Sequence, residues 1–217
     1  MRLHDKFESL LVKATKLFRP QVVHGPSSAR RESNAWLRRQ CNDICGRVLS
    51  IGSGDDSDGE GGTYRNYFTI ASSYTTSEVG PDFGCNLTLD IRSMPELSDG
   101  SFDCIYCSGV LEHVDDFQAG FDEITRTLHD GGVLLLGLPF RQAIHMSPND
   151  FWRFTEYGIR HLMRHAYEIQ HITPIDPLEG IEFPAAYWVR AIKVGIKCGL
   201  PGTTAAGLEL IRGTAER

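Results

Sequence analysis

The residues whose types and spacing most clearly suit chemistry are two glycines, Gly52 and Gly54, in the segment VLSIGSG. Residues 47–51 are apolar enough to form a short buried strand, and that strand ends at the first glycine. Because glycine carries no side chain, the backbone can bend sharply here and let a ligand approach its N–H groups. A Gly-x-Gly turn alone is a weak signal, so its meaning depends on the residues around it.

Two acidic residues follow later strand candidates and give this turn a context. Glu78 ends the second candidate, and Asp90 lies near the end of the third. In nucleotide-binding α/β folds, an acid at the end of the second strand accepts hydrogen bonds from ribose hydroxyls. The spacing from Gly52 to Glu78 exceeds the usual ~20 residues, and the inserted loop SDGEGGT accounts for the excess. Asp90 would be within reach of an adenine amino group.

The elements that must position these residues alternate between short apolar runs and helical patterns from residue 46 onward. The runs do not alternate with polar residues, which is typical of parallel strands covered by helices on both faces. We therefore expect an α/β fold with a doubly wound, mostly parallel seven-stranded sheet whose last strand is antiparallel. The strand candidates are residues 47–51, 73–79, 85–91, 102–108, 132–138, 167–173 and 187–194, and helix candidates are residues 115–129 and 155–166.

Helical patterns also precede the sheet. Apolar residues recur at helical spacing up to Pro20, and the segment ARRESNAWLRRQCNDIC shows a second pattern of the same kind. We expect residues 1–45 to form an N-terminal helical cap, residues 46–200 to form the main domain, and residues 201–217 to be a frayed tail.

In motif order and spacing, the chain resembles the class I S-adenosylmethionine-dependent methyltransferases, of the small-molecule or glycan type known as methyltransferase-11. The corresponding segments here are VLSIGSG, YTTSEV, LTLDI, GSFDCIYCSGVLEHV and LHDGGVLLLGLPF. They cover roughly residues 46–165 and are specific in combination, although no single segment is. The resemblance implies a Rossmann-like methyltransferase fold and S-adenosyl-L-methionine as the cofactor.

The resemblance also implies cofactor contacts at the ends of the strands. The glycine turn would pass beneath the methionine part of the cofactor, and Glu78 would bind the ribose diol. Asp90 and the backbone of Ile91 would read the adenine edge, and Ser108 and Gly109 would lie near the sulfonium. The full set implied is Gly52, Ser53, Gly54, Glu78, Asp90, Ile91, Ser108 and Gly109.

One residue of the glycine turn departs from the family pattern. The family often has another glycine two residues after Gly54, where this chain has Asp56. A carboxylate there would repel the cofactor carboxylate unless it points to solvent. The path of this loop is therefore a question for the structure.

Two histidines are the candidates for a general base, which a hydroxyl acceptor needs in order to lose its proton. His113 follows the fourth strand candidate and His145 lies in the loop after the fifth. Ligands of open α/β sheets bind at the carboxyl ends of the strands, where these loops lie. His113 has a structural alternative, because Glu112 and His113 could merely begin a helix. Asp150 could likewise cap the following helix or pair with Arg153.

The loop that carries His145 also suggests a substrate class. Its pattern H-x-x-P-x-D-x-W-R-F-T resembles a segment of methyltransferases encoded with glycan and cell-surface polysaccharide assembly. The expected function is therefore O-methylation of a sugar or another small hydroxylated molecule, in polysaccharide biosynthesis. The alternative is a binding or scaffold protein that keeps the fold without catalysis.

Other kinds of site fit the sequence less well. A nicotinamide dehydrogenase would have G-x-G-x-x-G, but Ser57 stands in the last position, and no N/D-P-P-Y/F tetrapeptide indicates DNA amino-methylation. Cys104 and Cys107 form C-x-x-C within a strand candidate, so their thiols would point to opposite faces and bind no zinc. No Asp/His/Glu cluster with ligand spacing is visible, so we expect no metal site.

Composition sets the remaining limits. The chain has 217 residues and a formal net charge of −6, so a nucleic-acid partner is not expected. No run approaches ~18 apolar residues, the length of a membrane span, and the N-terminus lacks the pattern of a signal peptide. We expect a cytoplasmic enzyme with a small-molecule or glycan acceptor. The oligomeric state is not predicted.

Overall fold

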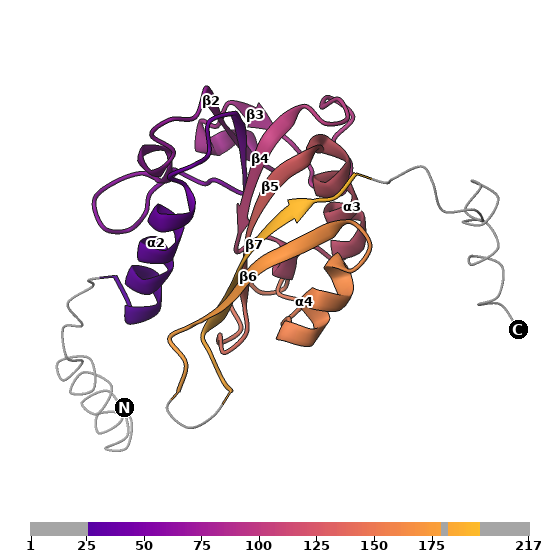
Figure 1. Cartoon of the computed structure of the whole chain (residues 1–217). Helices are drawn as coiled ribbons and strands as arrows, with labels where there is room; N and C mark the ends of the chain where they lie inside the picture. Colours follow the sequence, from indigo (N-terminus) through magenta and orange to yellow (C-terminus); the bar gives the residue numbers. More distant parts are fainter. Residues whose placement is uncertain (1–25, 179–181, 196–217) are drawn as a thin grey trace, which may run out of the picture.

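The computed structural model describes residues 26–178 and 182–195 (Figure 1). The predicted helix before Pro20 and the predicted tail, residues 201–217, lie outside the described residues. A seven-stranded sheet in the order β3-β2-β1-β4-β5-β7-β6 forms the centre of the molecule. Its strands are β1 (Arg47–Ile51), β2 (Ser73–Glu78), β3 (Leu87–Thr88), β4 (Phe102–Ser108), β5 (Leu128–Pro139), β6 (Tyr167–Ile175) and β7 (Ala186–Lys193).

The direction of the strands confirms the predicted fold class. β1 pairs in parallel with β2 and β4, and β2–β3 and β4–β5 are also parallel pairs. β7 runs antiparallel to both of its neighbours, β5 and β6. This is the doubly wound, mostly parallel sheet that the unalternating strands predict.

Within the described residues, three α-helices cover the sheet, and a side chain caps the first turn of each. They are α2 (Ser28–Gln40), α3 (Phe117–Thr127) and α4 (Glu156–Met163). The side chains of Ser27, Asp116 and Thr155 accept hydrogen bonds from backbone N–H groups of these first turns. Such caps satisfy N–H groups that have no partner within the helix, which explains why the helices begin where they do. Three short 3₁₀ helices complete the fold: η1 (Tyr64–Tyr67), η2 (Pro81–Phe83) and η3 (Leu111–His113).

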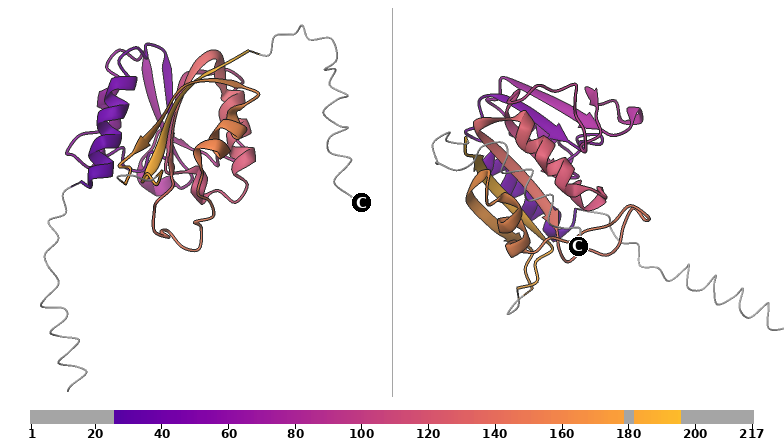
Figure 2. Two further views of the ribbon diagram at one scale, coloured as in Figure 1. Left: turned by 60° about the horizontal axis from the view of Figure 1, so that its bottom comes forward. Right: turned by 90° about the vertical axis from the view of Figure 1, so that its right-hand side faces the viewer.

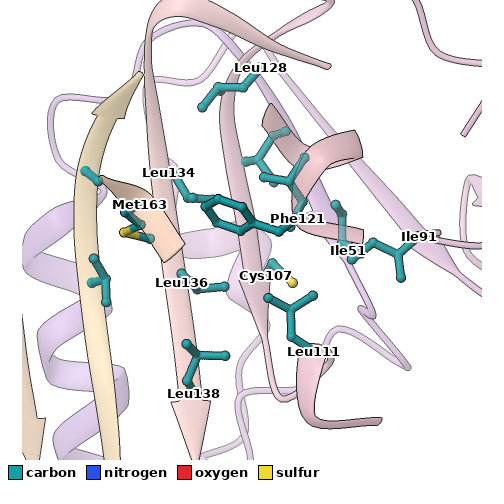
Figure 3. Close-up of a cluster of buried hydrophobic side chains, with 14 of the residues drawn as sticks. Ile51, Ile91, Cys107, Leu111, Phe121, Leu128, Leu134, Leu136, Leu138 and Met163 are labelled. Atoms are coloured by element: carbon teal, nitrogen blue, oxygen red, sulfur yellow. The ribbon is translucent and has the colours of Figure 1, made fainter. Parts of the chain in front are cut away.

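The helices form outer layers on opposite faces of the sheet, with α2 on one face and α3 and α4 on the other (Figures 1 and 2). Each face has its own apolar core. Figure 3 shows the core beneath α3, in which Phe121 lies against Leu134 and Leu136 of β5. Cys107 belongs to this core and Cys104 to the other, so the two thiols do point to opposite faces as predicted.

Helix α2 is fixed to its face of the sheet by two tryptophans. The indole N–H of Trp36 donates to Thr173 on β6 (2.9 Å), and that of Trp188 on β7 donates to Ser33 of α2 (2.9 Å). The two rings are in contact, with centroids 5.2 Å apart. Buried aromatic rings whose polar atoms are satisfied are favourable packing elements, and this pair holds α2 over β6 and β7.

Several predicted boundaries differ from the structure, most of all those of β5 and β3. β5 begins at Leu128 instead of residue 132, because Leu128 pairs with Phe102 before the register shifts and the chain passes through Gly131, at φ 83°. β3 contains two residues instead of the predicted seven, since Asp90 leaves the sheet to form a bridge with Ser93. Both differences come from local irregularities that apolar patterning does not report.

Candidate functional site

The glycine turn after β1 is open on its ligand side. Gly52 and Gly54 have φ angles of 68° and 52°, a region that glycine adopts without strain. A Cβ atom at Gly52 would collide with the side chain of Val110. A Cβ atom at Gly54 would meet nothing within 4 Å. The turn therefore packs closely against the end of β4 and leaves free space at Gly54, where a cofactor can approach the backbone.

Glu78 lies beside this turn, as predicted from its place at the end of β2. Its carboxylate accepts hydrogen bonds from the N–H of Gly54 (3.1 Å) and of Val79 (3.2 Å). The pairing of β1 with β2 brings the two segments together, and the N–H of Ser53 donates to the carbonyl of Ser77 (3.0 Å). A half-buried carboxylate next to an open glycine turn fits the ribose and methionine parts of S-adenosylmethionine.

Asp56 is directed away from that space. Its carboxylate accepts hydrogen bonds from the hydroxyl of Tyr74 (2.8 Å) and from the N–H of Arg65 (3.1 Å). Its φ of 59° is left-handed, and aspartate is among the few residues other than glycine that adopt this region. The structure thus accounts for the departure from the family pattern, because the carboxylate binds the protein's own chain.

Asp90 lies near Glu78 but is already paired. The N–H of Leu89 donates to the carbonyl of Glu78 (2.9 Å), which places this segment beside the end of β2. The guanidinium of Arg92 contacts the Asp90 carboxylate at 2.7 Å, and its hydrogen bonds hold the pKa of Asp90 below the ordinary value. Ile91 follows with its side chain in the core. The adenine contact of Asp90 and Ile91 stays a prediction.

The end of β4 provides the second half of the site. Ser108 is the last residue of the strand, and Gly109 follows at φ 69° with its N–H donating to the carbonyl of Gly137 (3.1 Å). A Cβ atom at Gly109 would lie 3.6 Å from the carboxylate of Glu112. The predicted position of the sulfonium therefore adjoins the residues of η3.

The two predicted histidines meet at this place. The ring centroids of His113, in η3, and His145, in the loop after β5, are 4.7 Å apart with the rings nearly perpendicular. Glu112 joins them, with a carboxylate oxygen 3.8 Å from Nε2 of His113. One ligand atom from each of the three residues lies within 4.8 Å of the others. Within the described part of the chain, this cluster combines two bases and an acid beside the glycine-rich turns.

Glu112 was missed as a functional residue in the sequence, where it reads as the start of a helix. Its side chain is only 2% exposed, and its Oε2 atom has no hydrogen-bond partner. Burial raises the pKa of Glu112 to about 7. The adjacency of Glu112 and His113 is visible in the sequence, but the burial depends on the distant loop that covers them.

That loop orients both imidazoles. Nδ1 of His113 is 2.6 Å from the carbonyl of Asn149, and Nδ1 of His145 is 3.1 Å from the carbonyl of Ala143 and 3.3 Å from Asp150. Because these partners are acceptors, we assign the proton of each ring to Nδ1 and a free lone pair to Nε2. Hydrogen bonds from Arg153 and from the His145 N–H hold the pKa of Asp150 well below its usual range.

Backbone contacts fasten the loop to η3. The N–H of Phe151 donates to the carbonyl of Glu112 (2.8 Å), and the indole N–H of Trp152 donates to the carbonyl of Val114 (2.9 Å). The same loop exposes the apolar side chains of Ile144 and Met146. The loop that carries His145 is therefore held on η3 by its C-terminal part and exposes two apolar side chains next to the histidine cluster.

Comparison with known proteins relates this chain to methyltransferases. A family model described as a methyltransferase domain matches residues 71–136. No curated protein matches the chain. None of the helices within residues 26–178 and 182–195 combines the length and apolarity that a membrane crossing requires.

Solved structures share the fold at low sequence identity. The 1,6-didemethyltoxoflavin-N1-methyltransferase of Burkholderia thailandensis, with bound 1,6-didemethyltoxoflavin and S-adenosylhomocysteine, is 16% identical, with a TM-score of 0.58 over 90% of this chain and 92% of that chain. The N-methyltransferase NodS of Bradyrhizobium japonicum WM9, in complex with S-adenosylhomocysteine, is 18% identical, with a TM-score of 0.58 over 80% and 90%. An S-adenosylmethionine-dependent methyltransferase from Aquifex aeolicus is 14% identical, with a TM-score of 0.54 over 84% and 98%.

Proposed function

We propose that this chain is a class I S-adenosylmethionine-dependent methyltransferase and that it methylates an oxygen atom of a sugar or another small hydroxylated molecule. The match of residues 71–136 to a methyltransferase-domain model and the fold shared with solved methyltransferases support the reaction class. The observation that carries this proposal is the pair of imidazoles of His113 and His145, whose Nδ1 atoms face carbonyl oxygens, so that each Nε2 is left to act as a base. S-adenosylmethionine, the cofactor of the family, supplies a methyl group on a positively charged sulfur.

The residues at the ends of β1, β2 and β4 position the donor. The open space at Gly54 admits the methionine part, and Glu78 accepts hydrogen bonds from the ribose hydroxyls. Gly109 leaves room for the reacting carbon because it carries no side chain. Methyl transfer is a direct displacement, so holding donor and acceptor in line provides a large share of the rate.

His145 is the better placed of the two bases. Its Nε2 can accept the proton of an acceptor hydroxyl, while Asp150 holds Nδ1 and stabilises the imidazolium that results. Asp150 stays ionised because Arg153 pairs with it at 2.7 Å. An amine acceptor that is already neutral would need no such base, and so this arrangement favours oxygen over nitrogen.

A sugar acceptor is supported by the loop over the cluster. Phe151 and Trp152 are 45% and 39% exposed on this loop, and aromatic rings suit the apolar face of a sugar. The resemblance of H-x-x-P-x-D-x-W-R-F-T to segments of glycan-related methyltransferases supports the same substrate class and a role in polysaccharide biosynthesis.

The first test is thermal unfolding with S-adenosylmethionine, S-adenosylhomocysteine, NAD or no ligand. At ~100 times the dissociation constant, ligand stabilises the folded state by about 2.7 kcal/mol, which raises the unfolding temperature by several degrees. A shift with the adenosyl compounds alone agrees with the proposal. No shift at saturating concentrations would favour the alternative, a binding or scaffold protein without catalysis.

The second test measures S-adenosylhomocysteine formation with panels of hydroxylated sugars, phenols and amines. With the best hydroxylated acceptor, His145→Ala should lower turnover by about 10²-fold or more, the usual contribution of a general base. Cofactor affinity should stay unchanged, because His145 does not contact the glycine turn. His171→Ala, on β6, is the matched control and should retain full turnover. Equal turnover in both variants would remove His145 from the mechanism.

A further inference from the structure

We propose that Glu112, His113 and His145 form a binding site for one divalent transition-metal cation, of the Zn²⁺ or Co²⁺ type. The three residues come from η3 and from a loop more than thirty residues later, so no ligand spacing is visible in the sequence. The binding site rests on the geometry of the cluster alone. Only its role in catalysis, described below, rests on the proposed function.

The first argument is the unsatisfied carboxylate of Glu112. This side chain is 2% exposed, and Oε2 has no hydrogen-bond partner. Oε1 is 3.8 Å from Nε2 of His113, which is too long for a hydrogen bond. Buried polar atoms almost always have partners, and an isolated buried carboxylate is costly. A cation bound to this carboxylate would supply the missing partner of Oε2.

The second argument is the orientation of the imidazoles. His113 gives its Nδ1 to the carbonyl of Asn149, and His145 gives its Nδ1 to Ala143 and Asp150. With the proton on Nδ1, each Nε2 keeps a lone pair, and Nε2 of His113 lies 3.8 Å from the Glu112 carboxylate. Metal-bound histidines in proteins have this arrangement, in which the second nitrogen donates to a carbonyl or carboxylate that fixes the ring.

The third argument is the fit of the ligand set to the metal. The three ligand atoms lie within 4.8 Å of one another. A zinc ion bonded at ~2.0–2.1 Å would hold them about 3.4 Å apart, so the cluster must contract by roughly 1 Å. His145 can supply this movement, since its loop is largely exposed. Two imidazoles with one carboxylate suit zinc-like cations, whereas Mg²⁺ and Ca²⁺ prefer sets made of oxygen alone.

Three protein ligands leave a coordination position open, as in catalytic zinc sites. Gly109 adjoins Glu112, so an acceptor held beside Gly109 would be close to this set of ligands. A hydroxyl oxygen bound there would lose its proton to water more easily, since a cation lowers the pKa of a coordinated hydroxyl. If the bound cation activates the acceptor, removing it with a chelator should lower turnover. If the imidazoles act as bases, a chelator should free them from the cation and raise turnover.

The test is titration of the chelator-treated full chain with Co²⁺, followed by visible absorption, and with Zn²⁺, followed by calorimetry. We expect one equivalent of each ion to bind, with cobalt bands typical of four or five ligands. Glu112→Gln, His113→Ala and His145→Ala should each weaken binding at least tenfold, because even residues that only orient ligands contribute tenfold or more. His171→Ala and Cys45→Ser, which replace exposed ligand types outside the cluster, should bind as the parent protein does.

The unfolding temperature separates loss of the site from loss of the fold. In metal-free protein, Glu112→Gln should unfold at the same or a higher temperature, because it replaces an unpartnered buried carboxyl group with a neutral side chain of the same size. Added Zn²⁺ should raise the unfolding temperature of the parent protein and leave that of Glu112→Gln unchanged. No binding at millimolar metal, or equal binding by Glu112→Gln, would overturn the cation site. The proposed methyl transfer would still stand in that case if the protein binds S-adenosylhomocysteine and if chelation does not change its turnover.

Discussion

Glu78 shows how much one side chain can do at this site. Its two carboxylate oxygens accept N–H groups from the glycine turn and from the residue after β2, so it stabilises the turn before any ligand arrives. We predict that the same carboxylate also accepts ribose hydroxyls when the cofactor binds. Because hydrogen bonds to a charged acceptor are strong, its loss should be visible in cofactor affinity.

We expect Glu78→Ala to weaken S-adenosylhomocysteine binding by more than ~1 kcal/mol, or about fivefold and upward. Calorimetric titration measures this directly. Glu168→Ala, on exposed β6 at the other end of the sheet, removes the same kind of side chain and should bind the ligand normally. If the two variants had equal affinity, Glu78 would not contact the ribose.

The individual residues of the site differ in how far the sequence predicts them. The neighbourhood of Gly54 and Glu78 is predictable, because both end strands that pair in parallel. The pairing of Asp90 with Arg92 and the burial of Glu112 are not, since each depends on side-chain positions that no periodicity encodes. The cluster of Glu112, His113 and His145 is likewise not predictable from the sequence, because only the loop after β5 brings its members together.

At the scale of elements, the loop from β1 to η1 is organised around one aspartate. The Asp58 carboxylate accepts hydrogen bonds from the N–H groups of Glu60 (2.7 Å) and Gly62 (2.9 Å) and from the hydroxyl of Tyr67 (2.7 Å). The Asp58 carbonyl accepts from the side chain of Asn34 in α2 (2.9 Å). The glycine-rich insertion is thus a fixed structure that joins α2 to the glycine turn after β1.

Asp58→Asn should destabilise the protein by about 2 kcal/mol at pH 7, because the N–H groups of Glu60 and Gly62 and the hydroxyl of Tyr67 lose a charged acceptor. Burial alone raises the pKa of Asp58, but the Tyr67 hydroxyl and the N–H groups bring it below the ordinary value. The contribution is therefore complete above the unfolded pKa of about 4 and is lost as pH falls through the lower folded pKa. Denaturant unfolding of both proteins between pH 7 and pH 3 checks this. A constant difference in stability across that range would contradict it.

The elements themselves follow the sequence closely where local signals are strong. β1 and β4 have the predicted ends, and Gly52 and Gly109 terminate them by turning into the left-handed region. α2 ends at Gln40, five residues before the predicted end of the N-terminal region. Cys41 is its C-cap, and the Cys41 N–H donates to the carbonyl of Leu37. Apolar periodicity predicts which elements exist, and irregular backbone geometry decides their final residues.

At the scale of the whole molecule, helices cover both faces of the sheet, so β5 has buried side chains on both of its sides. Leu134 belongs to the core under α3, and the next residue, Leu135, belongs to the core under α2. Both side chains are completely buried. In a sheet with one wet face, one of two successive residues would be exposed.

We expect Leu134→Ala and Leu135→Ala to lower the free energy of unfolding by about 2–5 kcal/mol each, the cost of a cavity in a packed core. Leu178→Ala removes the same atoms from an exposed position and should change stability by less than about 0.5 kcal/mol. Denaturant unfolding gives all three values. A small effect at either buried leucine would mean that its face of the sheet is not covered as described.

The two outer strands of the sheet bear on how this protein behaves at high concentration. Exposed strand edges offer unpaired N–H and C=O groups to other molecules, which invites aggregation. Here one edge, β3, has only two residues. The other edge, β6, carries exposed Glu168 and His171, and its Pro174 has no N–H to donate. Neither edge is a good template for another strand, so intermolecular sheet growth should be slow even in concentrated solution.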